Sequence, residues 1–370
     1  MGLLGFVYCA FIVVVVIQII FYVFISGKFA FSKLKKARFK NVPVSIIICA
    51  KNEAENLKRF LPSVIEQDFP NFEIVLINDS SKDETLDVMQ AFSKLHDNIK
   101  IVDVKSIEAF WGNKKYALTL GIKASKYEHL VFTDADCKPV SNLWLKEMAS
   151  HFSNKKTLVL GYGAYAKIKN SFLNKVIRFE TLITAVNYFS FALNGMPYMG
   201  VGRNLAYVKN EFFKVNGFIK HIKVQSGDDD LFINHVATND NTTICVSKES
   251  FTESTPKTTF KAWFFQKRRH VSTAHHYKTK HKIILALQYV SNLSFWLFTF
   301  FLLTTLYNWP IVLGLFLTRI MVQYLVLGLS FKKLNEIDLL FLLPFLEIFL
   351  IIAQMAIFIN NLISKPNHWK

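Results

Sequence analysis

The stretch Leu130-Val131-Phe132-Thr133-Asp134-Ala135-Asp136 joins a short apolar run to two carboxylates that stand one residue apart. Such a run predicts a buried strand that ends where the acids begin. In an open α/β sheet, ligands bind in the crevice beyond the carboxyl ends of the strands, so we expect Asp134 and Asp136 at a ligand site. Two hard oxygen donors suit Mg²⁺ or Mn²⁺ completed by substrate phosphates, which indicates a nucleotide-linked substrate.

The region around this stretch alternates apolar runs with helical patterns. We predict strands over 44–50, 73–78, 99–104 and 129–133, and helices over 52–65, 81–95 and 114–124. This order implies an α/β fold with a parallel sheet that is covered by helices on both faces. Two capping boxes, Asn52 with Glu55 and Ser81 with Glu84, are expected to open the first two helices.

Apolar segments at both ends of the chain predict an integral membrane protein. Hydrophobic residues make up 52% of the 370 residues, and the surplus lies in 3–26 and beyond 283. We expect an anchor over 1–27, an interfacial segment over 258–282, and three spans within 283–363, at about 283–305, 310–330 and 337–362. The basic stretch 28–40 and the Lys332-Lys333 loop lie inside under the positive-inside rule, with both chain ends outside. The region 42–257 is then a cytoplasmic domain, and a bacterial inner (plasma) membrane is the expected location.

The formal net charge of +17 does not indicate nucleic-acid binding. The basic runs at 28–40 and 261–282 flank predicted spans and suit anionic lipid headgroups, so membrane lipids are the expected partners. The four cysteines are widely spaced, show no zinc pattern and are expected to be reduced. Nothing in the sequence sets the oligomeric state.

Two features of the apolar regions have alternative interpretations. The aromatic stretch 171–193 predicts a helix, which we favour as a core or membrane-lying helix over a groove for an acceptor lipid. Arg319 and Glu347 lie within predicted spans, where they either face protein or carry function.

Further acids follow the first two predicted strands. Glu53 comes after the first strand and Asp79 after the second. Each alone is explained as a helix-start acid or a turn residue. Because the carboxyl ends of parallel strands meet at one edge of a sheet, we expect both to share a crevice with the Asp134/Asp136 pair.

The segment Gly227-Asp228-Asp229-Asp230 places three acids before an apolar helical start. Such a cluster either complements a helix dipole or supplies a general base. A sugar hydroxyl that attacks an anomeric carbon must lose its proton, and a positioned carboxylate is the usual recipient. The later run Gln266-Lys267-Arg268-Arg269-His270 supplies cations that suit phosphate oxygens or an acceptor.

Seven segments occur in the order that is typical of membrane-bound family 2 glycosyltransferases. They are Ala50-Lys51-Asn52-Glu53, Asn78-Asp79-Ser80-Ser81, Gly112-Asn113-Lys114-Lys115-Tyr116-Ala117-Leu118, Asp134-Ala135-Asp136, Gly202-Arg203-Asn204, Gly227-Asp228-Asp229 and Gln266 to His270. Over about 42–275 the chain therefore resembles this family, and a polysaccharide synthase in particular.

The resemblance implies a GT-A fold with a Rossmann-like, mostly parallel sheet, an inverting transfer from a nucleotide sugar, and a divalent metal. It implies substrate-binding roles for Ala50, Glu53, Asp79, Lys114, Asp134, Arg203, Gln266 and Arg269. Asp136 and Asp134 match the metal ligands. Asp229 matches the catalytic base, with Asp228 before it, although three adjacent acids leave the register open to Asp230.

The expected function is transfer of a sugar from a UDP- or GDP-linked donor to a lipid-linked or glycan acceptor at the cytoplasmic membrane face, as in cell-envelope glycan synthesis. A processive synthase that also exports its polymer is the alternative. His270 stands where the synthases' Q-x-x-R-W segment has tryptophan, and three C-terminal spans are few for a polymer channel, which favours single addition. A non-catalytic nucleotide-sugar scaffold is the third hypothesis.

Overall fold

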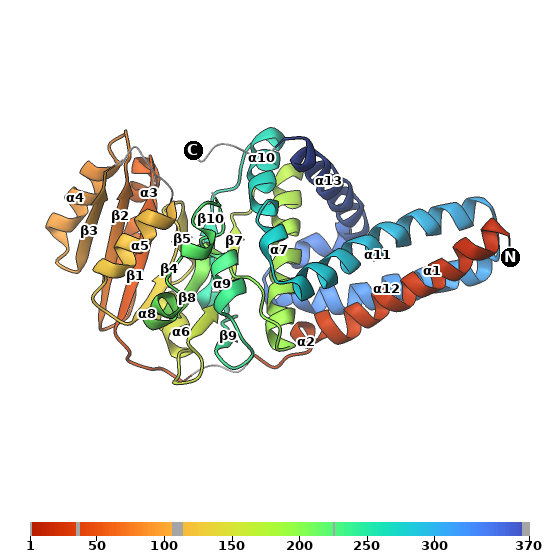
Figure 1. The fold of residues 1–370 in the computed structure, drawn as a ribbon, viewed down its shortest axis with the longest axis horizontal. Helices are drawn as coiled ribbons and strands as arrows, with labels where there is room; N and C mark the ends of the chain where they lie inside the picture. The colour runs from red at the N-terminus through yellow and green to blue at the C-terminus, as the bar shows by residue number, and fades with distance from the viewer. Residues whose placement is uncertain (1, 35–37, 106–113, 225, 365–370) are drawn as a thin grey trace.

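A seven-stranded, mostly parallel sheet forms the centre of the region that carries the motifs (Figure 1). The computed structural model describes residues 2–34, 38–105, 114–224 and 226–364. The strands lie in the order β3-β2-β1-β4-β8-β6-β9, and β8 runs antiparallel to both of its neighbours. Their bounds are β1 Val44–Ala50, β2 Phe72–Asp79, β3 Ile99–Val104, β4 His129–Phe132, β6 Leu158–Leu160, β8 Leu205–Val208 and β9 Thr242–Ile244. The predicted α/β fold and its four leading strands are confirmed.

Helices cover both faces of this sheet. Alternate residues of β1 point to opposite faces, so Ile46 and Ile48 join one core while Ile47 joins the other. The first core lies beneath α3 (Ala54–Ile65), α4 (Thr85–Leu95) and α6 (Trp144–Ser150). The second lies beneath α5 (Lys114–Ala124), α7 (Phe172–Leu193), α8 (Lys209–Lys214) and α9 (Asp230–Val236).

The two predicted capping boxes are wrong. Helix α3 begins at Ala54 and α4 at Thr85, and the residue before each makes no side-chain capping bond. The Asp83 carboxylate accepts instead from Ala54 N at 3.3 Å and from Thr85 N at 3.1 Å. The expected capping groups bond across to each other instead, because Asn52 N donates to Ser81 Oγ at 3.0 Å and Lys82 N donates to Asn52 Oδ1 at 2.8 Å. Asn52 has a φ of 54°, a left-handed conformation that asparagine tolerates. The turns after β1 and β2 are therefore fastened together at the edge where the site lies.

A smaller three-stranded sheet follows the Asp134/Asp136 pair directly. It has the order β5-β10-β7, with bounds Cys137–Pro139, Thr252–Ser254 and Gly163–Tyr165. Its strands bring the residues after Asp136 next to Ser254 and Tyr165. The second sheet therefore forms one rim of the crevice.

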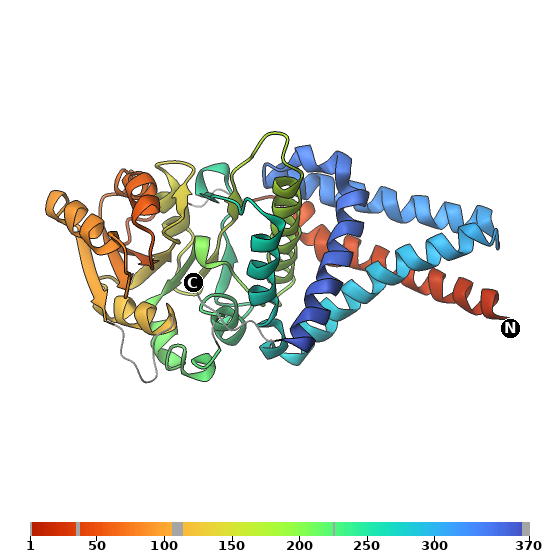
Figure 2. The ribbon, with the colours of Figure 1, turned by 90° about the horizontal axis from the view of Figure 1, so that it is seen from above.

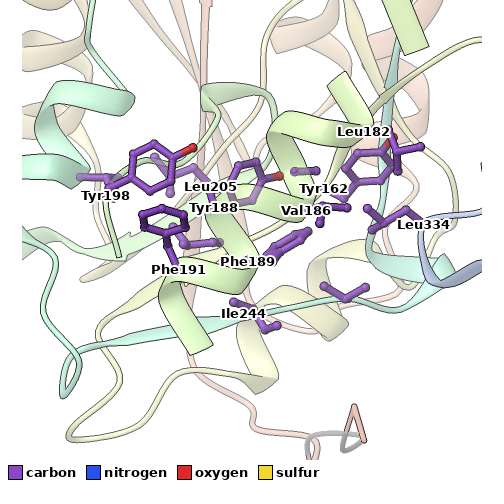
Figure 3. Close-up of a cluster of buried hydrophobic side chains, with 14 of the residues drawn as sticks. Tyr162, Leu182, Val186, Tyr188, Phe189, Phe191, Tyr198, Leu205, Ile244 and Leu334 are labelled. Atoms are coloured by element: carbon purple, nitrogen blue, oxygen red, sulfur yellow. The ribbon is translucent and has the colours of Figure 1, made fainter. Parts of the chain in front are cut away.

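Helix α7 joins the sheet to the C-terminal helices. Its aromatic side chains Phe179, Tyr188, Phe189 and Phe191 are all buried. Figure 3 shows Tyr188, Phe189 and Phe191 among side chains from both the sheet and the C-terminal segment, including Leu205 and Leu334. The predicted core helix is present. It connects the seven-stranded sheet to the C-terminal apolar helices through one continuous core.

Three long helices extend away from the sheet as a bundle, as Figures 1 and 2 show. They are α1 (Leu3–Ile20, continued by a π-helical turn and α2 to Ala30), α11 (Thr279–Thr304) and α12 (Trp309–Lys333). Among the described residues, five helices are long and apolar enough to cross a membrane: these three, α7, and the segment Ile337–Ile363. These helices indicate membrane association. Arg319 of α12 faces protein, since it is fully buried and lies 2.8 Å from Glu347.

The last helix, α13 (Leu343–Ile363), lies across the bundle beside α7 and α10 (Figure 2). The short helix before it carries Asp338, which accepts a hydrogen bond from Arg178 of α7 at 2.6 Å. At its other end, Asn361 Oδ1 accepts from Arg268 Nε of α10 at 3.0 Å. Both ends of the segment that contains α13 therefore contact the region that carries the motifs, and the expected topology with both chain ends outside stays a prediction. Hydropathy reports the length and apolarity of a helix but not its direction.

We predict that Arg178→Met strongly lowers stability. Arg178 pairs with Glu336, which is 2% exposed, and removal of the cation leaves that carboxylate buried without its partner. A loss of about 3–5 kcal/mol in the free energy of unfolding is expected, measured by denaturant unfolding in detergent.

The matched control is Lys167→Met, because Lys167 contacts the same acids from the surface, where its side chain is 46% exposed. Its loss costs at most about 1 kcal/mol. Equal losses for the two variants would contradict a buried anchor at Arg178.

Candidate active site

One cavity of about 950 Å³ lies between the carboxyl ends of the strands and the helices α7, α10 (Phe260–Val271) and α11. The cavity is lined by the following residues from the predicted set: Glu53, Asp79, Lys114, Asp134, Asp136, Arg203, Asp228, Asp229, Gln266 and Arg269. Ala50 ends β1 just behind this wall and is buried. Gly112 and Asn113 lie outside the described residues. The structure thus brings side chains from all seven predicted segments to one cavity.

At one end of the cavity, Asp79 presents an unsatisfied acceptor. Its side chain is buried, and Oδ2 has no hydrogen-bond partner among the described residues, although Lys51 Nζ lies 3.9 Å away. Burial raises the pKa of Asp79, and the ammonium groups of Lys51 and Lys114 oppose that rise. Glu53 lies nearby, and its Oε2 accepts from Asn56 Nδ2 at 2.5 Å. An orphaned buried acceptor suits an N–H or O–H donor from a ligand such as a nucleobase or ribose.

A possible metal-binding group lies at Asp134, Asp136 and Cys137. Their ligand atoms all lie within 4.8 Å of one another. Burial, together with the charges of Asp134 and Glu53, raises the pKa of Asp136, as expected where carboxylates lie close together. The Cys137 thiol lies 2.8 Å from Ser254 Oγ, so the two carboxylates are the better donors. Paired carboxylates beside an open cavity fit a hard divalent cation such as Mg²⁺ or Mn²⁺.

Two residues of Gly202-Arg203-Asn204 have separate tasks. The Arg203 guanidinium lies over the Tyr165 ring at 4.3 Å and donates to Ala164 O and Ser254 Oγ, each at 3.2 Å. These contacts hold a fixed positive charge in the wall beside Asp136. Asn204 is fully buried behind it and accepts from Trp144 Nε1 at 3.0 Å. Arg203 therefore faces the cavity, whereas Asn204 holds the backbone next to Arg203 in place.

Lys114 bridges the two groups of acids in the cavity. Its Nζ lies 2.9 Å from Asp134 Oδ1 and 3.0 Å from Asp228 Oδ2. Burial opposes the charge on Lys114, but these carboxylates raise its pKa well above the usual value. Lys114 in turn lowers the pKa of Asp228 against the effect of burial. Asp228 is thereby kept ionised and engaged.

The three successive acids have different partners. Asp230 accepts from Thr273 Oγ1 at 2.5 Å and from Tyr277 Oη at 2.6 Å, so it anchors the loop to the segment after α10. Among the described residues, Asp229 accepts hydrogen bonds only from backbone N–H groups. Gly202 N donates to its Oδ2 and Asp230 N donates to its Oδ1, each at 2.7 Å. Burial and the neighbouring charges of Asp228 and Asp230 raise the pKa of Asp229 to about 7. Of the three, Asp229 is the one placed to exchange a proton near neutral pH.

Sequence reasoning missed the part that Lys115 plays. This lysine is 1% exposed, and its Nζ donates to the carbonyls of His221, Val224 and Ser226, each at 2.7 Å. It therefore holds the loop that leads into Gly227. Its neighbour Lys114 faces the cavity, and the sequence carries no signal that tells the two adjacent lysines apart.

The run Gln266 to His270 divides between the cavity and the surrounding helices. All five of these residues line the cavity, and two of them also contact neighbouring helices. Lys267 forms an ion pair with Glu180 of α7, and Arg268 Nη2 donates to Ser364 Oγ at 2.8 Å. Lys267 and Arg268 therefore already have protein partners, and they fasten α10 to α7 and α13.

Known proteins resemble this chain in the region of the site. The sequence profile described as Glycosyl transferase family 2 matches residues 45–210. Poly-beta-1,6-N-acetyl-D-glucosamine synthase of Staphylococcus epidermidis is 37% identical over 119 residues, which are 32% of this chain and 28% of that protein. Glycosyltransferase AglE of Haloferax volcanii is 32% identical over 120 residues, which are 32% of this chain and 38% of that protein. The match thus spans well under half of either relative.

The mannosyltransferase PcManGT from Pyrobaculum calidifontis, solved in complex with GDP-Man and Mn2+, has a similar fold. The alignment covers 90% of this chain and 99% of that chain, with a TM-score of 0.60 and 16% sequence identity. The fold therefore agrees beyond the matched domain. Residues 45–210 therefore match the glycosyl transferase family 2 model on a GT-A-like fold, in agreement with the resemblance inferred from the motifs.

We predict that Asp136→Asn weakens Mn²⁺ binding at least tenfold, because it removes one of two charged ligands. Electron paramagnetic resonance of free Mn²⁺ measures this without any turnover. Asp97→Asn, which changes an exposed acid far from the cavity, is the control and should bind as the unmodified chain does. Unchanged Mn²⁺ affinity in Asp136→Asn would show that the pair is not the metal site.

We also predict that Lys115→Met loosens the loop before Asp229. Loss of three bonds from a charged donor should speed amide hydrogen exchange of residues 226–230 about tenfold or more. Lys123→Met, an exposed lysine on the same helix, should leave the exchange rates unchanged. If both variants exchange alike, Lys115 does not hold the loop.

Proposed function

We propose that this protein is an inverting, metal-dependent glycosyltransferase that moves a sugar from a nucleotide-sugar donor to a lipid-linked or glycan acceptor. The observation that carries the proposal is the placement of Asp229. A carboxylate with a pKa near neutrality, fixed by two backbone N–H groups, lines the same cavity as the Asp134/Asp136 pair and the buried acceptor of Asp79. The proposed base, the proposed metal and diphosphate site at Asp134 and Asp136, and the proposed nucleoside site at Asp79 thus line the same cavity.

The chain's residues divide the work of transfer among them. Asp79 and Glu53 bind the nucleoside, and Lys114 and Arg203 bring positive charge to the diphosphate. Asp229 takes the proton of the acceptor hydroxyl while the hydroxyl oxygen of the acceptor bonds to the anomeric carbon of the donor sugar. The bond from that carbon to the diphosphate oxygen breaks, and its electron pair leaves with the nucleotide, so the configuration inverts. A divalent cation held by Asp134 and Asp136 would neutralise charge on the leaving diphosphate.

We propose that the domain over 42–257 works at the cytoplasmic face of a bacterial plasma membrane. In this arrangement α1, α11 and α12 cross the bilayer, while α7 and α13 lie along its inner surface. Six exposed apolar side chains of α13 support this, since they fall on one stripe at helical spacing: Phe345, Ile348, Ile352, Met355, Ile359 and Leu362. The basic segments that flank α1 and α11 suit the inner surface.

The direct test of the proposed activity compares Asp229→Asn with Asp240→Asn. With Mg²⁺ or Mn²⁺ and a panel of UDP- and GDP-sugars, Asp229→Asn should lower transfer or donor hydrolysis about 10²–10⁴-fold, since it removes the base. Asp240 is exposed on the turn before β9, so its amide variant should keep full activity. Full activity in Asp229→Asn would overturn the assignment, and binding of donor without any turnover in the unmodified protein would favour the scaffold.

The pH dependence follows from the raised pKa of Asp229. The base works only when deprotonated, so kcat/KM should fall as pH drops through about 7 and level off above about pH 8. A rate profile measured from pH 5.5 to 9 at saturating metal checks this. A flat profile across that range would contradict a base with this pKa.

A processive synthase remains the second candidate, because the matched Staphylococcus relative is a polysaccharide synthase by name. Gel separation of the products distinguishes the two. Single transfer gives one discrete addition, whereas processive synthesis gives long chains.

A further inference from the structure

Helix α7 turns a row of polar side chains toward the cavity. Glu180, Thr181, Thr184 and Asn187 follow the spacing of one helix face, and all four line the cavity. The opposite face of α7 is packed into the aromatic core. This row lies at the end of the cavity away from the nucleotide-binding acids, where the walls come from helices rather than from strand ends.

Hydrogen bonds within the protein account for part of this row, since Thr184 Oγ1 donates to Glu180 Oε1 at 3.3 Å, but they do not account for Thr181. Thr181 is 7% exposed, and its hydroxyl has no hydrogen-bond partner among the described residues. A buried hydroxyl without a partner is unfavourable, so its retention toward a cavity indicates a ligand group that completes it. By contrast Tyr188, on the same side of the helix, already donates to Gly161 O at 2.7 Å and is structural.

Neutral polar groups from other helices face the same space. Asn187 and Gln288 of α11 exchange two amide hydrogen bonds, at 3.3 and 3.2 Å. Gln354 of α13 also lines the cavity, and Phe265 of α10 contributes a ring that is 53% exposed. Glu180 is neutralised by its ion pair with Lys267. The chamber therefore offers hydroxyl, amide and aromatic groups without a free cation among these residues.

We propose that the row on α7 is a subsite for a saccharide unit of the acceptor. Hydroxyl and amide groups complement the many hydroxyls of a sugar, and an aromatic ring accommodates its apolar face. A hydrocarbon tail would leave the hydroxyl of Thr181 unsatisfied, and the ion pair of Glu180 with Lys267 leaves no unpaired charge on this row for a phosphate. The inference rests on the proposed function and specifies that function's acceptor as a sugar-bearing molecule.

The test measures sugar binding apart from catalysis. The full chain in lipid nanodiscs is titrated with hexyl glycosides of glucose, galactose, mannose and N-acetylglucosamine, and with hexyl phosphate, by saturation-transfer NMR. At least one glycoside should bind more tightly than hexyl phosphate. The double variant Thr181→Val with Asn187→Leu should weaken that binding at least tenfold, because two hydrogen-bonding side chains are lost.

Two controls separate this outcome from others. Ser190→Ala removes a fully buried hydroxyl of α7 that does not line the cavity, and it should change glycoside affinity less than twofold. Thermal stabilisation by the nucleotide sugar should be the same in all variants. Failure of every glycoside to exceed hexyl phosphate, or unchanged affinity in the double variant, would overturn the subsite. Glycoside binding that the double variant loses, without any sugar transfer by the unmodified chain, would uphold the subsite and refute the proposed activity.

Discussion

Three consecutive carboxylates in one cavity wall are the constraint on which the rest of this structure depends. Acids withdrawn from water need compensation, and each of the three obtains it differently. Lys114 forms an ion pair with Asp228, and two hydroxyl groups donate hydrogen bonds to Asp230. The hydrogen bonds to Asp229 from the described residues come from backbone N–H groups. Burial and the two neighbouring charges raise the pKa of the middle acid to about 7, a value that suits proton transfer near neutral pH.

These compensating contacts also tie distant parts of the chain together. Lys114 and Lys115 join the start of α5 to the loop before α9, and Asp230 joins that loop to the segment after α10. Helix α10 is fastened in turn to α7 through Lys267 and to α13 through Arg268. The geometry of the proposed base is thus linked to α7 and α13, the helices that we propose lie at the membrane surface.

Much of the fold and of the site could be predicted from the sequence. The run 130–136 and the alternation around it gave the parallel strands, because buried strands carry short, uniformly apolar patterns. The strand-end acids converge as parallel topology requires. Partners that depend on tertiary contact could not be predicted: Asn52 and Ser81 bond to each other rather than capping helices, and Lys115 holds carbonyls that lie about a hundred residues away along the chain. The direction of α13 is likewise set by Arg178 and Arg268, not by hydropathy.

The central claim is that Asp229 titrates near neutrality, and infrared difference spectroscopy tests it most directly. Spectra of the protein in detergent are recorded between pH 5 and 9, and the protonated carboxyl band is followed in the unmodified chain and in Asp229→Asn. The account predicts a band that disappears with a midpoint near pH 7 and that is absent from Asp229→Asn. A band of the same midpoint and intensity in both proteins, or no carboxyl titration above pH 5.5 in either, would contradict it.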